Sequence, residues 1–165
     1  MGTRSTITFI ERVNAGDSIE AQVYQQYDGY LEGVGKTLAE WLMPKIMVNG
    51  IPDYEHDYAN GIGDLAAQFV HDFKNRIGYL YLYSPDWDAE EWCDYNYKVI
   101  QTMSKNDYTG NADDVLTIVV TNWNNEEPFF VGKPSELLEY IKKGGDDSVW
   151  MFSLFSQSGD LGRRF

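Results

Sequence analysis

Two glycine-punctuated segments of this chain predict the same local structure, a turn followed at once by a helix. Residues 24–35 read YQQYDGYLEGVG, and residues 58–63 read YANGIG, so the second segment repeats part of the first at a constant offset. The aligned pairs are Tyr30 with Tyr58, Gly33 with Gly61, Gly35 with Gly63, Ala39 with Ala67 and Trp41 with Phe69. Because glycine permits tight turns and close backbone approach, the pattern predicts two helices that start in a similar way on one sheet.

The hydrophobic pattern around these segments predicts the strands. Residues 3–11 are rich in Thr, Ile and Phe, residues 14–17 read NAGD, and residues 19–24 alternate between apolar and polar. This order predicts a β-hairpin. Residues 79–83 read YLYLY, which predicts another strand, and residues 95–99 continue the same sheet.

A second group of strands is predicted further along the chain. Residues 115–120 are almost wholly apolar and largely β-branched, which is typical of a central strand covered on both faces. Residues 128–131 predict a short strand. Residues 149–155 are compatible with a strand or with a helix, and the last ten residues, 156–165, form a flexible tail in this interpretation.

Three helices follow from apolar spacing and from helix-end signals. The first contains Leu38, Trp41 and Leu42 and ends at Met43, before a proline. The second carries the stripe Leu65, Phe69, Val70, Phe73 and Ile77. The third covers residues 134–143, with proline at its first position and two lysines before a glycine at its end. We therefore predict a single α+β domain over residues 1–165, with a largely antiparallel sheet and about three helices packed on it.

The net charge of the chain limits the classes of molecule that it is expected to bind. The chain has 26 acidic and 13 basic side chains, a formal net charge of −13, which repels phosphate backbones and anionic membranes. We therefore expect no direct nucleic-acid binding and no membrane binding. The acidity either attracts a basic protein surface, imitates nucleic acid in a groove of a host protein, or only keeps the protein in solution. The single Cys93 and the lack of a basic and apolar leader predict a cytoplasmic protein.

The best candidate for a binding site is the first turn-to-helix segment together with the N-terminal arginine. Arg4 is one of few cations in the first half, and it could pair with Asp28 or meet an anionic ligand. A planar ligand could stack on Tyr24, Tyr27 and Tyr30 and accept or donate hydrogen bonds at its edge with Gln25 and Gln26. The alternative is structural, with a turn at residues 28–29 and tyrosines over the core. The predicted ligand-binding residues are Arg4, Gln26, Tyr27, Asp28, Tyr30, Gly33, Gly35 and Lys36.

The glycines alone do not define a nucleotide motif. Lys36 and Thr37 follow Gly35, but a P-loop would require glycine where Tyr30 stands. The alternative role of Gly33 and Gly35 is a tight turn with close packing of helix on sheet.

No metal site, cofactor or catalytic centre is predicted. Residues 53–57 hold Asp53, Glu55, His56 and Asp57, a density more typical of a solvated acidic loop than of a metal site. The acidic residues of 86–94 lack the glycine and distal glutamate of a calcium loop. His71 is interpreted as a surface or helix-packing residue, and Cys93 as buried and inert.

Three segments carry a resemblance to a known group of proteins. Residues 2–6 (GTRST), residues 24–35 and residues 60–68 together resemble a family of small uncharacterised proteins found in phage, bacterial and large DNA virus genomes. The resemblance extends through Tyr83, about half of the chain. It implies a viral or virus-derived origin, where accessory proteins often act on host factors, and it implies no catalytic residues.

The resulting hypothesis is a non-catalytic binding protein, a phage accessory or counter-defence factor. Its expected partner is a basic host protein surface or a small nucleotide-like ligand, in the host cytoplasm. Two alternatives stay open at this stage: a metal-dependent small hydrolase or nuclease that uses the acidic clusters, and a structural component of a virion.

Overall fold

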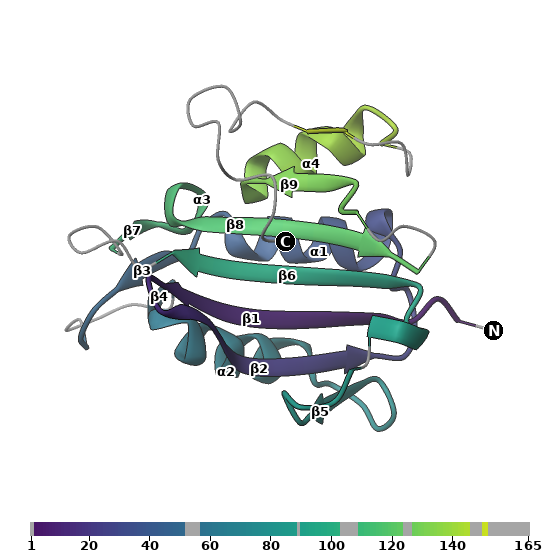
Figure 1. The fold of residues 1–165 in the computed structure, drawn as a ribbon, viewed down its shortest axis with the longest axis horizontal. Helices are drawn as coiled ribbons and strands as arrows, with labels where there is room; N and C mark the ends of the chain where they lie inside the picture. Colours follow the sequence, from purple (N-terminus) through teal and green to yellow (C-terminus); the bar gives the residue numbers. More distant parts are fainter. Residues whose placement is uncertain are drawn as a thin grey trace.

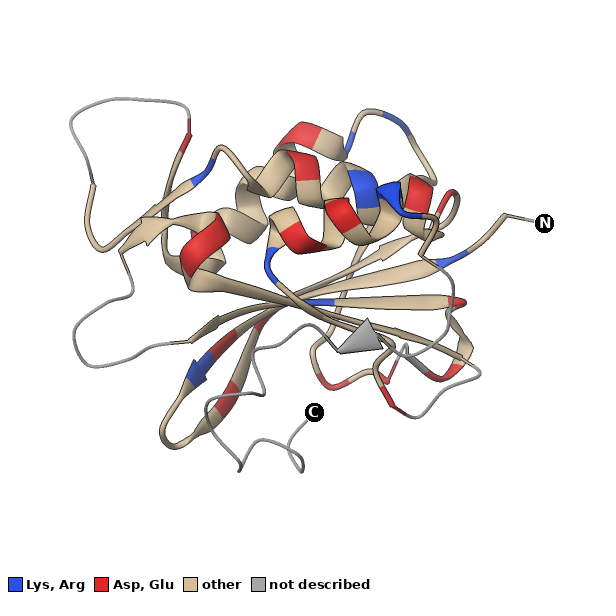
Figure 2. Cartoon of the chain, turned by 90° about the horizontal axis from the view of Figure 1, so that it is seen from above, with Lys and Arg blue, Asp and Glu red and all other residues tan. Residues whose placement is uncertain are grey.

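A mixed β-sheet with helices on one face forms the body of the protein in the computed structural model (Figures 1 and 2). The structure describes residues 2–51, 57–88, 90–102, 109–123, 127–145 and 150–151. In these residues the main sheet has seven strands in the order β10-β9-β8-β6-β1-β2-β5. The strands are β1 (Ser5–Val13), β2 (Gly16–Gln25), β5 (Leu80–Tyr83), β6 (Tyr95–Thr102), β8 (Leu116–Asn122), β9 (Phe130–Gly132) and β10 (Trp150–Met151).

The sheet is largely antiparallel, as predicted. β1 and β2 form the expected hairpin, in which Val13 pairs with Gly16, and β2 continues antiparallel to β5. β8 is antiparallel to both of its neighbours, β6 and β9. Two pairs are parallel, β1 with β6 and β9 with β10. The order of strands and helices confirms the predicted α+β class.

The apolar run at the middle of the sheet behaves as its composition predicts. Ile118 and Val120 point into the large core beneath the helices, with no exposed surface. Val119 points to the other face, where it is 2% exposed in a small cluster with Ile10, Ile100 and Val131. β8 is therefore covered on both faces.

The three predicted helices are present, and their residues explain where they begin and end. A π-helical turn, η1 (Leu31–Gly35), leads directly into α1 (Lys36–Leu42), and α2 covers Gly61–Phe73. α4 (Pro134–Lys142) begins at the predicted proline, and the Glu136 carboxylate accepts a hydrogen bond from the Lys133 backbone N–H at 2.8 Å. A fourth, short helix, α3 (Ala112–Val115), and a 3₁₀ turn, η2 (Glu90–Trp92), were not predicted.

The prediction that Ile77 belongs to the second helix is wrong. α2 ends at Phe73, and Ile77 lies beyond it as a fully exposed side chain. The chain turns back toward the sheet through Gly78, whose φ of 74° lies in the left-handed region that glycine adopts without strain. The spacing of Ile77 fitted the helical repeat, but the turn interrupts the helix before that residue.

A second, three-stranded sheet lies beside the first and was missed from the sequence. Its order is β4-β3-β7, formed by β3 (Ile46–Val48), β4 (Tyr58–Asn60) and β7 (Gly110–Asn111). β4 falls in the second repeated segment, where only a turn was predicted before the helix. Strands of two or three residues carry too little alternation to be recognised, and these are fixed by pairing between distant segments.

The core that positions the site lies between α1, α2 and the main sheet. Leu38 and Leu65 point into it from the two helices and are 1% and 0% exposed. Phe9 of β1 contacts Phe69 of α2, with ring centroids 5.7 Å apart. The two helices predicted from the repeated segments thus pack against the same face of one sheet (Figure 2).

Candidate functional site

The loop between β2 and η1 is built around one residue with a left-handed backbone. Asp28 has a φ of 61°, a region that Asp and Asn adopt more readily than most side chains. Its carbonyl oxygen accepts a hydrogen bond from the Val34 N–H at 2.9 Å. A Cβ atom at Gly33 would lie 3.3 Å from the Cβ of Asp28 and closer still to its carbonyl oxygen. Glycine at 33 therefore lets the helix start directly against the loop.

The next residue fastens this loop to the sheet. The N–H of Gly29 donates to the carbonyl oxygen of Thr3 at 2.9 Å, and its own carbonyl oxygen accepts a hydrogen bond from the buried Tyr97 hydroxyl at 2.9 Å. A Cβ atom at Gly29 would lie 2.8 Å from the backbone of Arg4. Main-chain hydrogen bonds thus hold the Asp28 loop in place, so the Asp28 carboxylate is not needed to fix the loop.

The two repeated glycine segments differ in what their glycines do. Gly61 has a φ of 76°, whereas Gly33 and Gly35 have no left-handed backbone. A Cβ atom at Gly35 would lie 3.3 Å from the Tyr97 ring, while one at Gly63 would meet nothing within 4 Å. Close packing explains the glycines of the first segment, and backbone conformation explains Gly61.

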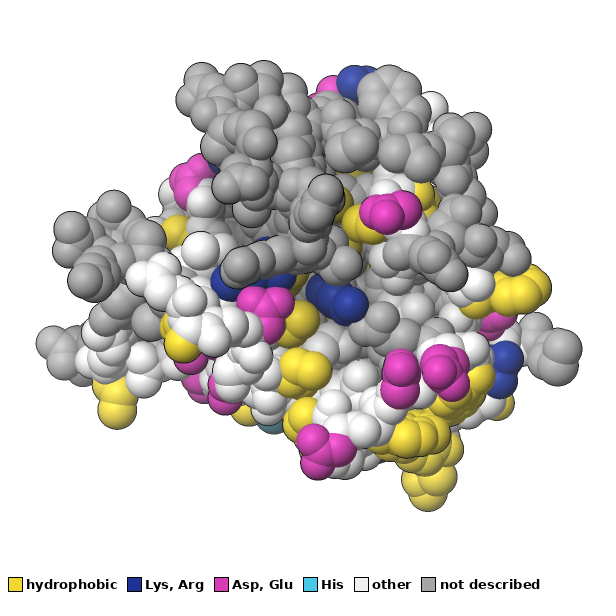
Figure 3. All heavy atoms as spheres, viewed as in Figure 1, with side chains coloured by type: hydrophobic (Ala, Val, Ile, Leu, Met, Phe, Trp, Pro, Cys, Tyr) yellow, Lys and Arg dark blue, Asp and Glu magenta, His cyan; other side chains and the backbone are white. Residues whose placement is uncertain are grey.

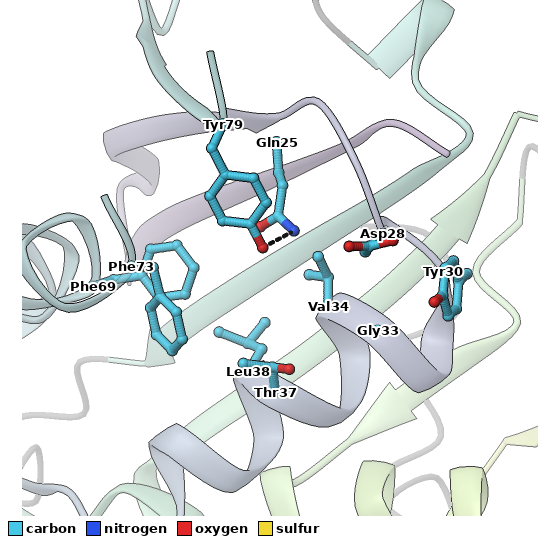
Figure 4. A pocket seen from close by; sticks show the side chains of 10 residues that line it. All are labelled: Gln25, Asp28, Tyr30, Gly33, Val34, Thr37, Leu38, Phe69, Phe73 and Tyr79. Atoms are coloured by element: carbon cyan, nitrogen blue, oxygen red, sulfur yellow. Dashed lines mark hydrogen bonds between the residues drawn. The ribbon is translucent and has the colours of Figure 1, made fainter. Parts of the chain in front are cut away.

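A cavity of about 200 Å³ opens between the first helix start and the C-terminal half of α2 (Figure 4). Figure 4 shows the Asp28 carboxylate and the Tyr79 hydroxyl on the same side of it, above Val34, with the aromatic rings of α2 at its other end. The lining residues are Gln25, Asp28, Tyr30, Gly33, Val34, Thr37, Leu38, Phe69, Phe73 and Tyr79.

A small hydrogen-bond network fixes the polar side of the cavity. The Gln25 amide nitrogen donates to the Tyr79 hydroxyl at 3.0 Å and to the Tyr27 carbonyl oxygen at 2.8 Å. Burial raises the pKa of the Tyr79 hydroxyl, and the neighbouring Asp28 carboxylate adds to this effect. Tyr79 is therefore protonated at neutral pH and can donate its own hydrogen while it accepts the one from Gln25.

The opposite side of the cavity is apolar. Phe69 and Phe73 are one helical turn apart on α2, with ring centroids 4.7 Å apart, and Leu38 faces them from α1. Phe69 is 3% exposed and Leu38 is 1% exposed, so these side chains form a fixed floor. The cavity thus offers flat apolar contacts at one end in addition to a carboxylate and a hydroxyl.

Of the eight predicted site residues, Asp28, Tyr30 and Gly33 line this cavity. Arg4 does not. Its backbone N–H donates to the Asp94 carboxylate at 2.7 Å, its side-chain Nε lies 3.8 Å from the same group, and its guanidinium lies 5.5 Å from the Trp92 ring centroid. The suggested pair of Arg4 with Asp28 is therefore replaced by Arg4 with Asp94.

The other four predicted residues take structural or surface positions. The Gln26 side chain accepts a hydrogen bond from the Tyr24 hydroxyl at 3.0 Å, and Tyr27 is 45% exposed. Gly35 is buried against the Tyr97 ring. Lys36 is exposed and lies 3.9 Å from Glu40 on the outer side of α1.

Gln25, which the sequence suggested as a partner for a ligand edge, also lines the cavity, whereas six lining residues were missed, namely Val34, Thr37, Leu38, Phe69, Phe73 and Tyr79. The helical stripe that contains Phe69 and Phe73 was identified, but as core. What distinguishes a lining side chain from a core side chain is the gap between two helices, and no single segment of the sequence encodes that gap.

The structure confirms the surface position predicted for His71 and the burial predicted for Cys93. The side chain of His71 is 87% exposed on α2, and Cys93 is fully buried. Among the described residues, no three His, Cys, Asp or Glu side chains gather in a way that could hold a metal ion. Of the acidic group at 53–57, only Asp57 is described; Asp53, Glu55 and His56 lie outside the described residues.

A second cavity of about 540 Å³ lies beside the end of α1, between Trp41, Lys45, Asp57 and the outer side of α2. Lys45 is 5% exposed, and its ammonium group lies 3.1 Å from the Gln68 side-chain oxygen and 4.7 Å from the Trp41 ring centroid. These partners are internal to the protein, so they account for the buried charge without a ligand.

Comparisons of the chain with protein-family models, curated proteins and solved structures give no significant match in any of the three. Within the described residues, no helix has both the length and the apolar character needed to cross a membrane.

Proposed function

We propose that this protein is a non-catalytic binding protein that holds a small planar ligand in the cavity between η1 and α2. The observation that carries the proposal is the lining of that cavity, which combines one carboxylate and one protonated tyrosine hydroxyl with the aromatic rings of α2. A few placed polar groups over apolar walls are typical of small-molecule sites.

The size of the cavity supports a ligand of one ring system. Sites for drug-sized molecules usually have volumes of about 300–1,000 Å³, and this cavity has about 200 Å³. A purine or pyrimidine base fits this range better than a whole nucleotide.

The charges around the cavity favour binding of the base of a nucleotide-like ligand and not of its phosphate. None of the ten lining residues is Lys or Arg, and Arg4, which was expected to meet an anionic ligand, lies beside Asp94 instead. An anionic group would meet the Asp28 carboxylate instead. We therefore propose a neutral or cationic heterocycle.

The arrangement of donors and acceptors narrows the class further. A carboxylate accepts two hydrogen bonds side by side, so Asp28 suits a ring edge with two adjacent N–H donors. The Tyr79 hydroxyl would donate to an acceptor on the same ring. Guanine has both features, with its N1–H and exocyclic amine as donors and O6 as acceptor.

The test is a titration calorimetry series with guanosine, inosine and adenosine. Inosine lacks the 2-amino group of guanosine. Adenosine lacks both the 2-amino group and the N1 hydrogen, and it carries an amine where guanine has O6. About 5 kcal/mol for the base corresponds to a Kd of roughly 0.2 mM. We expect guanosine to bind in this range, inosine to bind about tenfold more weakly, and adenosine to give no measurable heat.

Two variants make the test specific. Asp28→Asn keeps the left-handed backbone, because Asn tolerates positive φ, but it removes the carboxylate and should abolish guanosine binding. Glu32→Gln is the matched control, since Glu32 is an exposed acid of the same helix start that does not line the cavity. Equal loss of binding in both variants, or equal affinity for all three nucleosides, would refute the proposal.

A further inference from the structure

Aromatic side chains gather on the sheet face that points away from the helices, at the edge formed by β2 and β5. Val23 and Leu80 point into the core beneath the helices, so their neighbours in the strands, Tyr24 and Tyr81, point to the other face. The aromatic patch consists of Tyr24, Tyr81, Tyr83, Trp87 and Trp92.

The rings of the aromatic patch form a continuous packed surface. Tyr24 stacks on Tyr83 with centroids 5.4 Å apart, and Tyr83 meets Trp87 edge to face at 4.1 Å. Trp92 closes the group, 5.1 Å from both Tyr24 and Trp87. Tyr24 is 3% exposed, whereas Tyr81 and Trp87 are each 42% exposed. The inner rings therefore support an outer layer that is open to contact.

Acidic side chains border the open layer. Asp86 and Asp88 flank Trp87 directly in the chain, Glu91 follows in η2, and all three are exposed. Figure 3 shows hydrophobic side chains gathered beside acidic ones at the lower right, near the segment that follows β5. Carboxylates beside an exposed indole attract cations to its ring face.

The aromatic patch already holds cations of the protein itself at two of its rings. The Arg4 guanidinium lies 5.5 Å from the Trp92 centroid, and the Lys74 ammonium lies 5.5 Å from the Tyr81 centroid. Trp87 lies within the same patch and is the ring flanked by two carboxylates. A third cation at Trp87 would extend the same arrangement.

We propose that the aromatic patch and its acidic border form a docking surface for an arginine- or lysine-rich segment of a protein partner. Basic side chains of the partner would lie over Trp87 and pair with Asp86, Asp88 and Glu91. The net charge of −13 would accelerate the encounter and repel nucleic acids. This surface is on the sheet face opposite the cavity, so the inference does not depend on a ligand there.

The test is fluorescence anisotropy with a labelled peptide of alternating arginine and serine, and with a glutamate–serine peptide as the charge-reversed control. We expect the arginine peptide to bind and the glutamate peptide not to bind. Trp87→Ala should weaken binding about fivefold, since an exposed cation–π contact contributes about 1 kcal/mol. Trp87→Phe should recover part of that loss because it restores an aromatic ring.

Neutralisation of carboxylates tests whether the peptide binds at this surface or is attracted only by the net negative charge of the whole protein. The double variant Asp86→Asn with Asp88→Asn should weaken binding about threefold at low salt. The matched control, Glu32→Gln with Glu40→Gln, changes the net charge equally on exposed helical positions and should leave the affinity within about twofold. Equal weakening in both double variants, unchanged binding by Trp87→Ala, or no binding of the arginine peptide would overturn the inference.

Discussion

Alanine at one glycine of each repeated segment, Gly33 in the first and Gly63 in the second, should change the stability of the protein in opposite directions. A Cβ atom at Gly33 would lie well under 3.0 Å from the Asp28 carbonyl oxygen and 3.1 Å from its carbonyl carbon. These are backbone atoms, so the Asp28 loop has to move away by about 1 Å to reach normal contact. At Gly63, a Cβ atom would meet nothing within 4 Å.

The expected magnitudes follow from these contacts. Overpacking costs about 1–3 kcal/mol, and displacement of the Asp28 carbonyl weakens the hydrogen bond from Val34, worth about 1 kcal/mol. The gain in helix propensity from Gly to Ala offsets about 1 kcal/mol of this. Gly33→Ala should therefore destabilise by about 2 kcal/mol, which lowers the Tm by about 4–8 °C in a chain of this size. Gly63→Ala should stabilise by about 0.5 kcal/mol and raise the Tm by about 1–2 °C.

Urea unfolding followed by far-UV circular dichroism measures both free energies, and thermal melts give the Tm shifts. Gly33→Ala should also weaken guanosine binding, because the Asp28 loop moves. Gly63→Ala serves as the matched control, with the same chemical change in the same sequence pattern. If both variants shift stability in the same direction by the same amount, the two glycines have equivalent roles and the packing argument at Asp28 is wrong.

Two further predictions test the support of the site and the acid sensitivity of α2. Tyr97→Phe should lower the free energy of unfolding by about 1–2 kcal/mol in urea titrations, because the buried Gly29 carbonyl oxygen loses its hydroxyl donor; an unchanged value would show that the bond adds nothing. Hydrogen bonds from His71 and then from Trp41 lower the pKa of Asp72. A lowered pKa in the folded state stabilises above the unfolded pKa of about 4, and this stabilisation disappears as the pH falls through the folded value. Wild type should therefore be more stable than Asp72→Asn at neutral pH, and chemical denaturation curves at decreasing pH should show the difference shrink below about pH 4; a constant difference would refute this assignment.

Structure that depends on neighbouring residues was predictable from the sequence. The β1–β2 hairpin follows from alternation around a turn at residues 14–17, and α4 begins at Pro134 as its helix-start signals predict. These features are decided within a few residues. The same reasoning placed Ile77 in a helix, because its spacing is right and only the turn at Gly78 shows that the helix has already ended.

Features that depend on distant pairing were not predictable. The second sheet joins Ile46 to both Tyr58 and Asn111, across segments with no shared pattern. The cavity has the same origin. Asp28 was predicted as a site residue from the turn in which it lies. Tyr79, in contrast, reaches the site because β5 pairs with β2.

Arg4 shows that the fold determines which group a charged side chain pairs with. From the sequence, Asp28 and an anionic ligand were its suggested partners. The parallel pairing of β1 with β6 instead brings Arg4 next to Asp94, which precedes β6. Registers between distant strands are set by the whole sheet, so a pair of this kind follows from topology and not from local sequence.

The most direct test of the proposed ligand site is an NMR titration of the nitrogen-15-labelled protein with guanosine. The side-chain amide of Gln25 gives its own signals and lies in the cavity, hydrogen-bonded to Tyr79. If guanosine binds in the cavity, we expect saturable shifts for that amide and for backbone amides near Asp28 and Phe73, all absent in Asp28→Asn. No shift at the Gln25 amide on saturation with guanosine, or shifts confined to other surfaces, would contradict the proposed ligand site.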